Sequence, residues 1–153
     1  MKELTADYNS ILRFVGGKGE INLINERDVE RAGLEISVGF KGSKPKPLDS
    51  LTQSGGERSI ALMAFLLALQ KRIAAPFRAV DEFDVHMDPK NREAIAKLIT
   101  FNWGGRNEQY LVITSGEISV PEEGTHVIIV QNVGGSSKVA ELKPEVAGVK
   151  AVD

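Results

Sequence analysis

The feature that most constrains the fold is a glycine turn that runs directly into an apolar segment. The turn reads Gln-Ser-Gly-Gly-Glu-Arg-Ser over residues 53–59, and residues 60–69 are all apolar. A helix that is apolar on every face must be buried in protein or in lipid. Ten residues rise only about 15 Å along a helix, whereas a membrane span needs about twenty residues. The segment therefore predicts a core helix that is buried all round.

The start of this predicted helix has the chemistry of an anion site. Ser54 or Ser59 can accept a hydrogen bond from a free backbone N–H group of the first helical turn. Gly55 and Gly56 allow a ligand to approach the main chain closely. The positive end of the helix dipole favours a phosphate at this position.

An acidic strand end follows the helix. Residues 77–80 predict a short strand after Pro76, and Asp81 and Glu82 come directly after it. Neighbouring residues of a strand point to opposite faces, so we expect the two carboxylates to take different roles. One would reach the shell of a Mg²⁺ ion and the other would face an attacking water. The turn, the helix and the acidic pair, all within residues 53–88, make a combination far more specific than any one of them.

These segments resemble motifs of ABC-type ATPases. Ser-Gly-Gly-Glu at residues 54–57 resembles the signature motif, Val-Asp-Glu at 80–82 the end of the Walker B strand, and Met-Asp at 87–88 the D-loop. The longer strings QSGGERS, PFRAVDEFDVHMDP and NRE resemble the C-terminal head segment of SMC chromosome proteins, with the SMC five/six repair branch as the nearest match. The resemblance extends over residues 12–130, and residues 53–92 carry its specificity.

The resemblance implies a role for each matched residue. Asp81 would orient the shell of Mg²⁺ through a bound water, and Glu82 would position or deprotonate the attacking water. Asp88 would communicate between two nucleotide sites. The signature residues, which would bind the γ-phosphate of ATP held by a second head, are Ser54, Gly55, Gly56 and Glu57.

A phosphate-binding Walker A loop is missing from the sequence. Residues 16–19 read Gly-Gly-Lys-Gly, but the pattern requires Ser or Thr after the lysine, and Lys18 is followed by Gly19. Strand patterns follow instead, at residues 20–24 and 33–40, so the glycines predict a turn into a β-hairpin. The chain is therefore expected to be inactive alone and to need an N-terminal head lobe that carries Walker A.

The expected fold class is α/β, the C-terminal lobe of an ABC-type ATPase head. We expect a mostly parallel sheet flanked by helices, with the early hairpin as a satellite. Its further strands are expected at residues 110–114, 127–130 and 137–142, and a helix is expected to begin at Pro89 with Asp88 as its N-cap. Residues 1–142 would form the lobe, residues 1–13 would be a helix that ends a coiled-coil arm, and residues 143–153 would be a flexible tail.

Composition excludes several classes of function. The chain of 153 residues is 42% hydrophobic, carries a formal charge of −2 and has no cysteine. It therefore has enough apolar residues for one core, no global basic field for nucleic acid, and neither disulfides nor thiolate metal sites. The two histidines, His86 and His126, form no helical pair with glutamate of the kind found in zinc hydrolases. Three lysines in the loop 41–47 would either contact DNA phosphates or simply be solvated.

The predicted function is Mg²⁺-dependent ATP hydrolysis coupled to head dimerisation on DNA, in chromosome organisation or DNA repair. The resemblance implies as partners the N-terminal lobe, a second head in a homodimer or heterodimer, DNA and a kleisin-like subunit, with no membrane. It implies a location in the cytoplasm, on the nucleoid or chromosome, or in a nucleus. Two alternatives stay open: a head lobe of a coiled-coil double-strand-break repair or recombination ATPase, and a non-catalytic scaffold that binds a partner.

Overall fold

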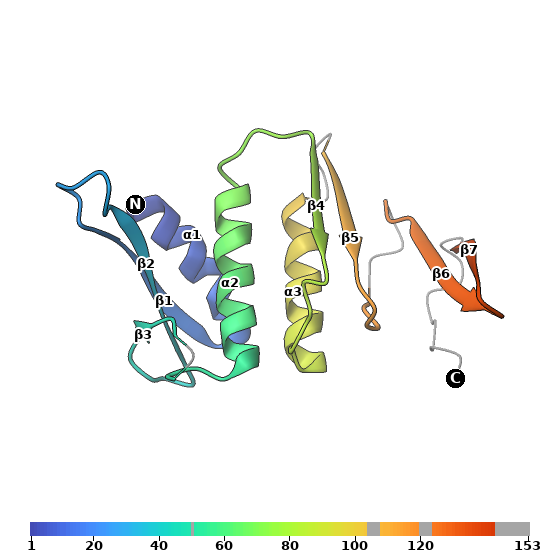
Figure 1. Ribbon diagram of the computed structural model, residues 1–153, viewed down its shortest axis with the longest axis horizontal. Coiled ribbons are helices and arrows are strands. Elements are labelled where there is room, and N and C mark those ends of the chain that lie inside the picture. The colour runs from blue at the N-terminus through green and yellow to red at the C-terminus, as the bar shows by residue number, and fades with distance from the viewer. Residues whose placement is uncertain (50, 104–107, 120–123, 143–153) are drawn as a thin grey trace.

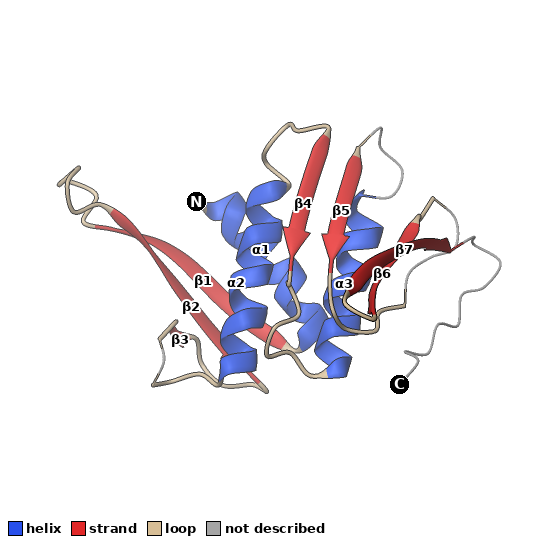
Figure 2. Cartoon of the chain, turned by 45° about the vertical axis from the view of Figure 1, so that its right-hand side comes forward, coloured by secondary structure: helices blue, strands red, loops and turns tan. Residues whose placement is uncertain are grey.

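The computed structural model describes residues 1–49, 51–103, 108–119 and 124–142, and the expected tail at 143–153 lies outside them. Figures 1 and 2 show the hairpin β1–β2 beside α1 at one end of the molecule, α2, α3 and the strands β4 and β5 in the middle, and the hairpin β6–β7 at the other end. The elements are α1 (Lys2–Leu12), η1 (Arg13–Val15), β1 (Gly17–Ile24), β2 (Gly33–Phe40), β3 (Lys46–Pro47), α2 (Gly55–Gln70), β4 (Phe77–Asp81), α3 (Pro89–Trp103), β5 (Gln109–Ile113), β6 (Val127–Val133) and β7 (Ser136–Leu142).

The N-terminal helix and hairpin form as the sequence predicts. The apolar face of α1, with helical spacing, is buried, and β1 pairs antiparallel with β2 over the full length of both strands. Gly19 lies where β1 crosses α1, and a Cβ there would be 2.5 Å from both the Ser37 carbonyl oxygen and the Tyr8 ring. Close packing thus accounts for this glycine, and the prediction of a hairpin rather than a phosphate loop is confirmed.

The expectation that α2 is buried all round is wrong for the chain by itself. The inner face of the helix belongs to the core, but Leu62 is 52% exposed and Leu66 is 39% exposed. These two residues are four apart, so they lie on one face of the helix. An apolar run gives no sign of which protein covers each face, and the chain covers only part of this one. The buried residues of α2 are Ile60, Ala61, Met63, Ala64, Leu67 and Ala68.

The strands β4 and β5 form a parallel pair connected through α3. Register pairs Phe77 with Gln109 and Asp81 with Ile113. The face with alternate residues Arg78, Val80, Tyr110 and Val112 is buried or half-buried. The opposite face leaves exposed the large apolar residues Phe77, Leu111 and Ile113. Parallel sheets in proteins are covered on both faces, so this pair has one face without its usual cover.

The described residues do not form the mostly parallel sheet that the sequence led us to expect. They form three sheets, β1–β2–β3, β4–β5 and β6–β7, of which only β4–β5 is parallel. The strand at Val127–Val133 pairs with Ser136–Leu142 through the Gly134-Gly135 turn, so its neighbour is the next strand along the chain. The expected last strand is thus confirmed, but in a separate antiparallel hairpin.

A buried arginine joins β4 to the end of α2. The Arg78 side chain is paired with Glu108 at 2.8 Å, and its second amino group donates to the carbonyl oxygens of Ile73 at 2.6 Å and Gln70 at 3.3 Å. Arg78 is only 7% exposed. The guanidinium therefore adds a second hydrogen bond to carbonyl groups at and after the end of α2, which also accept the Ile73 and Ala75 backbone N–H groups, and it joins the helix to the strand.

We predict that Arg78→Met lowers the free energy of unfolding by about 1–3 kcal/mol, because the half-buried Glu108 carboxylate loses its ion-pair partner and the two carbonyl groups each lose one hydrogen bond. Urea unfolding measures this change. Arg31→Met is the matched control, since Arg31 pairs with Asp28 on the surface, and it should change stability by less than about 0.5 kcal/mol. Equal losses in the two variants would refute the buried role of Arg78.

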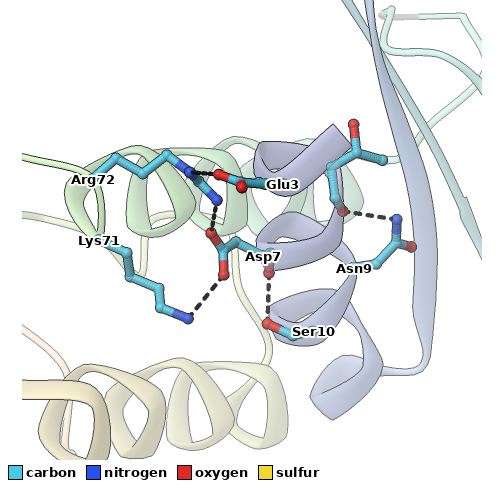
Figure 3. Close-up of polar contacts among 7 residues, drawn as sticks. Glu3, Asp7, Asn9, Ser10, Lys71 and Arg72 are labelled. Carbon is cyan, nitrogen blue, oxygen red and sulfur yellow. Dashed lines mark hydrogen bonds and ion pairs between the residues drawn. The ribbon is translucent and has the colours of Figure 1, made fainter. Parts of the chain in front are cut away.

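Ion pairs connect the other side of the α2 end to α1. Figure 3 shows Asp7 between Lys71 and Arg72, at 3.0 and 2.6 Å, and Arg72 also pairs with Glu3 at 2.8 Å. Burial raises the pKa of Asp7, but the hydrogen bonds from Lys71 and Arg72 outweigh this effect and hold the pKa below its usual value. The carboxylate is therefore charged at neutral pH, and α1 is held against the end of α2.

Candidate functional site

The glycine turn, residues 53–59, begins α2 with a capping box. The Ser54 hydroxyl oxygen accepts from the Glu57 backbone N–H at 3.2 Å, and a Glu57 carboxylate oxygen accepts from the Ser54 backbone N–H at 3.0 Å. Ser54, and not Ser59, is thus the cap. The box satisfies two backbone donors that would otherwise be unpaired and fixes the direction in which the turn enters the helix.

The capping box gives the predicted signature residues different hydrogen-bonding roles. The Ser54 hydroxyl uses its oxygen as an acceptor for Glu57, so its hydrogen is left to donate. The Glu57 carboxylate holds the turn itself, which makes Glu57 a residue that shapes the turn. Gly55 and Gly56 occupy the first two helical positions, where backbone N–H groups have no partner within a helix. The turn therefore presents a hydroxyl and backbone donors together, as an anion would require.

The acidic pair lies at the end of β4, but not with the geometry expected from strand alternation. Asp81 is the last residue of β4, and Glu82 has a φ of 48°, outside the strand region. The Glu82 backbone N–H still donates to the Ile113 carbonyl oxygen at 2.9 Å, after which the Val85 N–H bonds back to Glu82. The chain therefore turns at Glu82, and this turn sets the direction of its side chain. Both carboxylates are exposed.

The β4–α3 segment, residues 82–88, is anchored at several points. Phe83 and Met87 are buried, and the Asp84 carboxylate lies inside the fold. Asp88 begins α3 as predicted: its carboxylate accepts the Asn91 backbone N–H at 3.1 Å, and this hydrogen bond holds the pKa of Asp88 below its usual value. The predicted N-cap is confirmed, and the residue is charged at neutral pH.

The glycine turn packs directly against the β4–α3 segment. A Cβ on Gly56 would lie 2.8 Å from the His86 carbonyl oxygen, whereas a Cβ on Gly55 would lie 3.9 Å from the His86 Cβ. His86 itself has a φ of 64°, which aims its main chain toward the turn. This contact brings two of the sequence-predicted motifs together. Nothing in the sequence signals it, because the two residues are thirty positions apart and neither side chain makes the contact.

We predict opposite effects for alanine at the two neighbouring glycines. Gly56→Ala should destabilise the fold by about 1–3 kcal/mol, because the methyl group collides with a backbone oxygen that cannot move freely. Gly55→Ala should be neutral or stabilising by up to about 1 kcal/mol, because alanine favours the helix and the methyl group has room. Thermal unfolding of the two variants measures the difference, and equal stabilities would contradict the packing against His86.

Two lysines of the polar loop lie beside the glycine turn. Lys44 and Lys46 line a cavity of about 150 Å³ together with Gln53 and Glu57. The buried Gln53 side chain holds the end of the loop: its amide nitrogen donates to the Pro47 carbonyl oxygen at 3.4 Å, and its amide oxygen accepts the Asp49 backbone N–H at 3.0 Å. The two lysines therefore share a cavity with Glu57, the residue that shapes the glycine turn.

The acidic pair fits Mg²⁺ better than a metal that requires a dedicated cage. Within the described part of the chain, no group of three or more His, Cys, Asp and Glu residues converges as a metal site. Mg²⁺ is commonly held by one or two carboxylates together with water and substrate phosphates. Asp81 and Glu82 are exposed carboxylates at the end of a parallel strand, which is the kind of ligand that such an ion uses.

Comparison with known proteins shows the family. The sequence model of the family described as RecF/RecN/SMC N terminal domain matches residues 5–138, and the chain belongs to this family. It is 38% identical over 109 residues to the Structural maintenance of chromosomes protein 5 of Caenorhabditis elegans, covering 69% of this chain and 10% of the relative. The chain spans about a tenth of the length of the curated relatives it matches.

Solved structures support the same assignment. A chain described under ATP-driven dimerization and DNA-stimulated activation of SMC ATPases superposes with a TM-score of 0.75 at 29% identity, over 94% of this chain and 86% of that one. An SmcHead bound to the C-winged helix domain of ScpA gives 0.74 at 30% identity, over 94% and 44%. The fold is that of part of an SMC-type head. Among the residues that the structure describes, no helix combines the length and apolar character that a membrane crossing requires.

Proposed function

We propose that this chain is the C-terminal lobe of an SMC-type ATPase head, with its nearest functional kinship to the SMC five/six branch. The observation that carries the proposal is the contact of Gly56 with His86, which brings a capped, glycine-containing helix start against the segment that follows two carboxylates. An anion-binding turn and an acidic strand end in one unit suit a protein that handles nucleotide phosphates and Mg²⁺.

The missing half of the site is an N-terminal lobe that carries Walker A. Two exposed apolar surfaces support this proposal. One is the outer face of β4–β5, with Phe77, Leu111 and Ile113, and the other is on α2, with Leu62 and Leu66. Such apolar surface is expected where another protein element packs.

The residues of this chain would divide the work of ATP hydrolysis. Asp81 would hold the water shell of Mg²⁺, which neutralises phosphate charge when it is bound. Glu82 would orient the attacking water and accept its proton. Ser54 would donate its free hydroxyl hydrogen to the γ-phosphate bound by a second head, and Gly55 and Gly56 would donate backbone N–H groups. Asp88, at the start of α3, would couple the two sites.

Two heads would then close on ATP and separate after hydrolysis, because contacts to the γ-phosphate exist in one state only. The similarity to SMC ATPases with ATP-driven dimerization and DNA-stimulated activation supports coupling to DNA. The similarity to an SmcHead bound to ScpA supports a partner of that kind at the head. Relatives named as chromosome partition proteins support a chromosome or nucleoid location. A repair or recombination ATPase head would use the same residues.

Calorimetric titration of the chain alone with ATP and Mg²⁺ tests the half-site proposal. We expect at most weak heat and no turnover, because no loop of this chain supplies the Walker A lysine. A non-catalytic scaffold would behave in the same way alone, but it would gain no turnover when the N-terminal lobe is added. Micromolar affinity together with turnover by the chain alone would overturn the proposal.

A further inference from the structure

A buried ion pair involves Asp84, which lies in the β4–α3 segment, residues 82–88, two residues after Glu82. The Asp84 carboxylate, in a residue that is 6% exposed, lies 3.0 Å from the Arg92 guanidinium Nε of α3. The same carboxylate oxygen accepts a hydrogen bond from the Thr114 hydroxyl, at the end of β5, at 2.9 Å. Loss of either partner would leave a buried carboxylate without full compensation of its charge, which destabilises the fold. Asp84 therefore ties α3 and the end of β5 to the β4–α3 segment.

The main chain after β5 is seated on this pair. The Thr114 hydroxyl oxygen accepts the Gly116 backbone N–H at 3.0 Å while its hydrogen is donated to Asp84. A Cβ on Gly116 would lie 2.6 Å from the Asp84 carboxylate oxygen and 2.7 Å from the Arg92 guanidinium. No side chain fits between them. A shift of residues 114–116 must therefore either break the polar contacts or carry Asp84 with it.

A movement of Asp84 has two short routes to the proposed site. Asp84 follows Glu82 by two residues, and its carbonyl oxygen accepts the Met87 N–H at 3.0 Å. Between these points lies His86, whose carbonyl oxygen is the one packed on Gly56. The carboxylate of Asp84 thus holds the turn that carries Glu82 on one side and supports the glycine turn on the other.

We propose that Asp84 is a positioning residue through which the segment 114–116 sets the geometry of both Glu82 and the glycine turn. This inference rests on the proposed function. The segment acts by the Thr114 hydroxyl and by the main chain at Gly116, so its position is transmitted without a side chain that reaches the nucleotide. The coupling depends on the Thr114–Asp84 hydrogen bond and on the packing of Gly116, each of which can be either formed or broken. Two discrete arrangements of this kind are the physical requirement for a switch.

The test uses a matched pair at one position. Thr114→Val keeps the shape and removes the hydroxyl, whereas Thr114→Ser keeps the hydroxyl. Hydrogen–deuterium exchange of the full chain is followed at amides whose bonds depend on the two turns: Glu57, Arg58 and Met87. We expect Thr114→Val to accelerate exchange at all three by about tenfold, and Thr114→Ser to restore wild-type rates. Lys97→Met removes the surface pair with Glu93 on the same helix but leaves the Glu93 hydrogen bond to the Ser119 backbone N–H, and it should change none of them.

Turnover in the complete head supplies the second readout. Thr114→Val should lower kcat by about 10- to 100-fold with KM unchanged, because a small misplacement of a catalytic group has an effect of this size, and Thr114→Ser should restore it. If Thr114→Val does not fold, Arg92→Lys and Arg92→Gln replace the pair, with the lysine variant nearer to wild type. Equal behaviour of the matched variants in exchange would overturn the inference. Absence of turnover in the wild-type complete head would instead refute the proposed function, and the exchange result would still decide the role of Asp84.

Discussion

Glu82→Gln is expected to slow ATP hydrolysis in the complete head by about 10²–10⁴-fold, the range typical for loss of a general base. Glutamine keeps the shape of the side chain and much of its hydrogen bonding but cannot accept a proton from water. Glutamate and glutamine of similar shape can adopt the same backbone conformation, with φ 48° at position 82, so the fold should be unchanged. ATP should still bind, and the heads should stay closed for longer. Single-turnover hydrolysis and dimer lifetime measure the two effects.

Asp81→Asn separates this role from a merely structural one. The variant should weaken the retention of Mg²⁺, and hence ATP binding itself, because Mg²⁺ depends on few carboxylates. If the two acids only stabilise the end of β4, both variants should alter stability and neither should separate binding from turnover. Turnover at the wild-type rate in Glu82→Gln would remove this residue from the mechanism.

Ser54→Arg is expected to abolish ATP-dependent engagement of two heads while sparing nucleotide binding by each. A long side chain at the start of α2 blocks the approach of a phosphate to the backbone N–H groups. The substitution also removes the N-cap, which we expect to lower the free energy of unfolding by about 1 kcal/mol without unfolding the chain. Light scattering with and without ATP measures engagement.

Two control variants separate the loss of the cap from the loss of the phosphate contact. Ser54→Asp preserves capping, because aspartate accepts the same backbone hydrogen bond, but it places a negative charge against the phosphate. It should be as stable as wild type and still fail to engage. Ser59→Arg changes the serine that does not cap and should engage normally. Unchanged dimerisation in both Ser54 variants would place the phosphate contact elsewhere.

Local chemistry made much of the fold predictable from sequence. Two patterns indicate helix starts, because their side chains bond to the backbone within one turn. They are Ser54 with Glu57 three residues later, and Asp88 before Pro89. The alternation of residues 33–40 predicted β2 with its observed bounds. These features depend only on neighbours along the chain.

The features that were not predictable depend on distant partners or on surface that this chain leaves uncovered. The Gly56–His86 and Gly116–Asp84 contacts are made by main chain or by residues far apart, so periodicity carries no trace of them. The exposure of Leu62 differs from the expected all-round burial because an apolar run does not show which chain covers each face of the helix. The conformation of Glu82 was missed because strand alternation stops where the strand ends.

Reconstitution of ATP turnover tests the central claim most directly. The chain is mixed with the lobe that carries Walker A, and steady-state hydrolysis is measured for each component and for the mixture. The account predicts turnover in the mixture only, with loss of that turnover when the mixture contains Glu82→Gln. Turnover by the separate components, or a mixture that forms a stable complex and remains inactive with the wild-type chain, would contradict it.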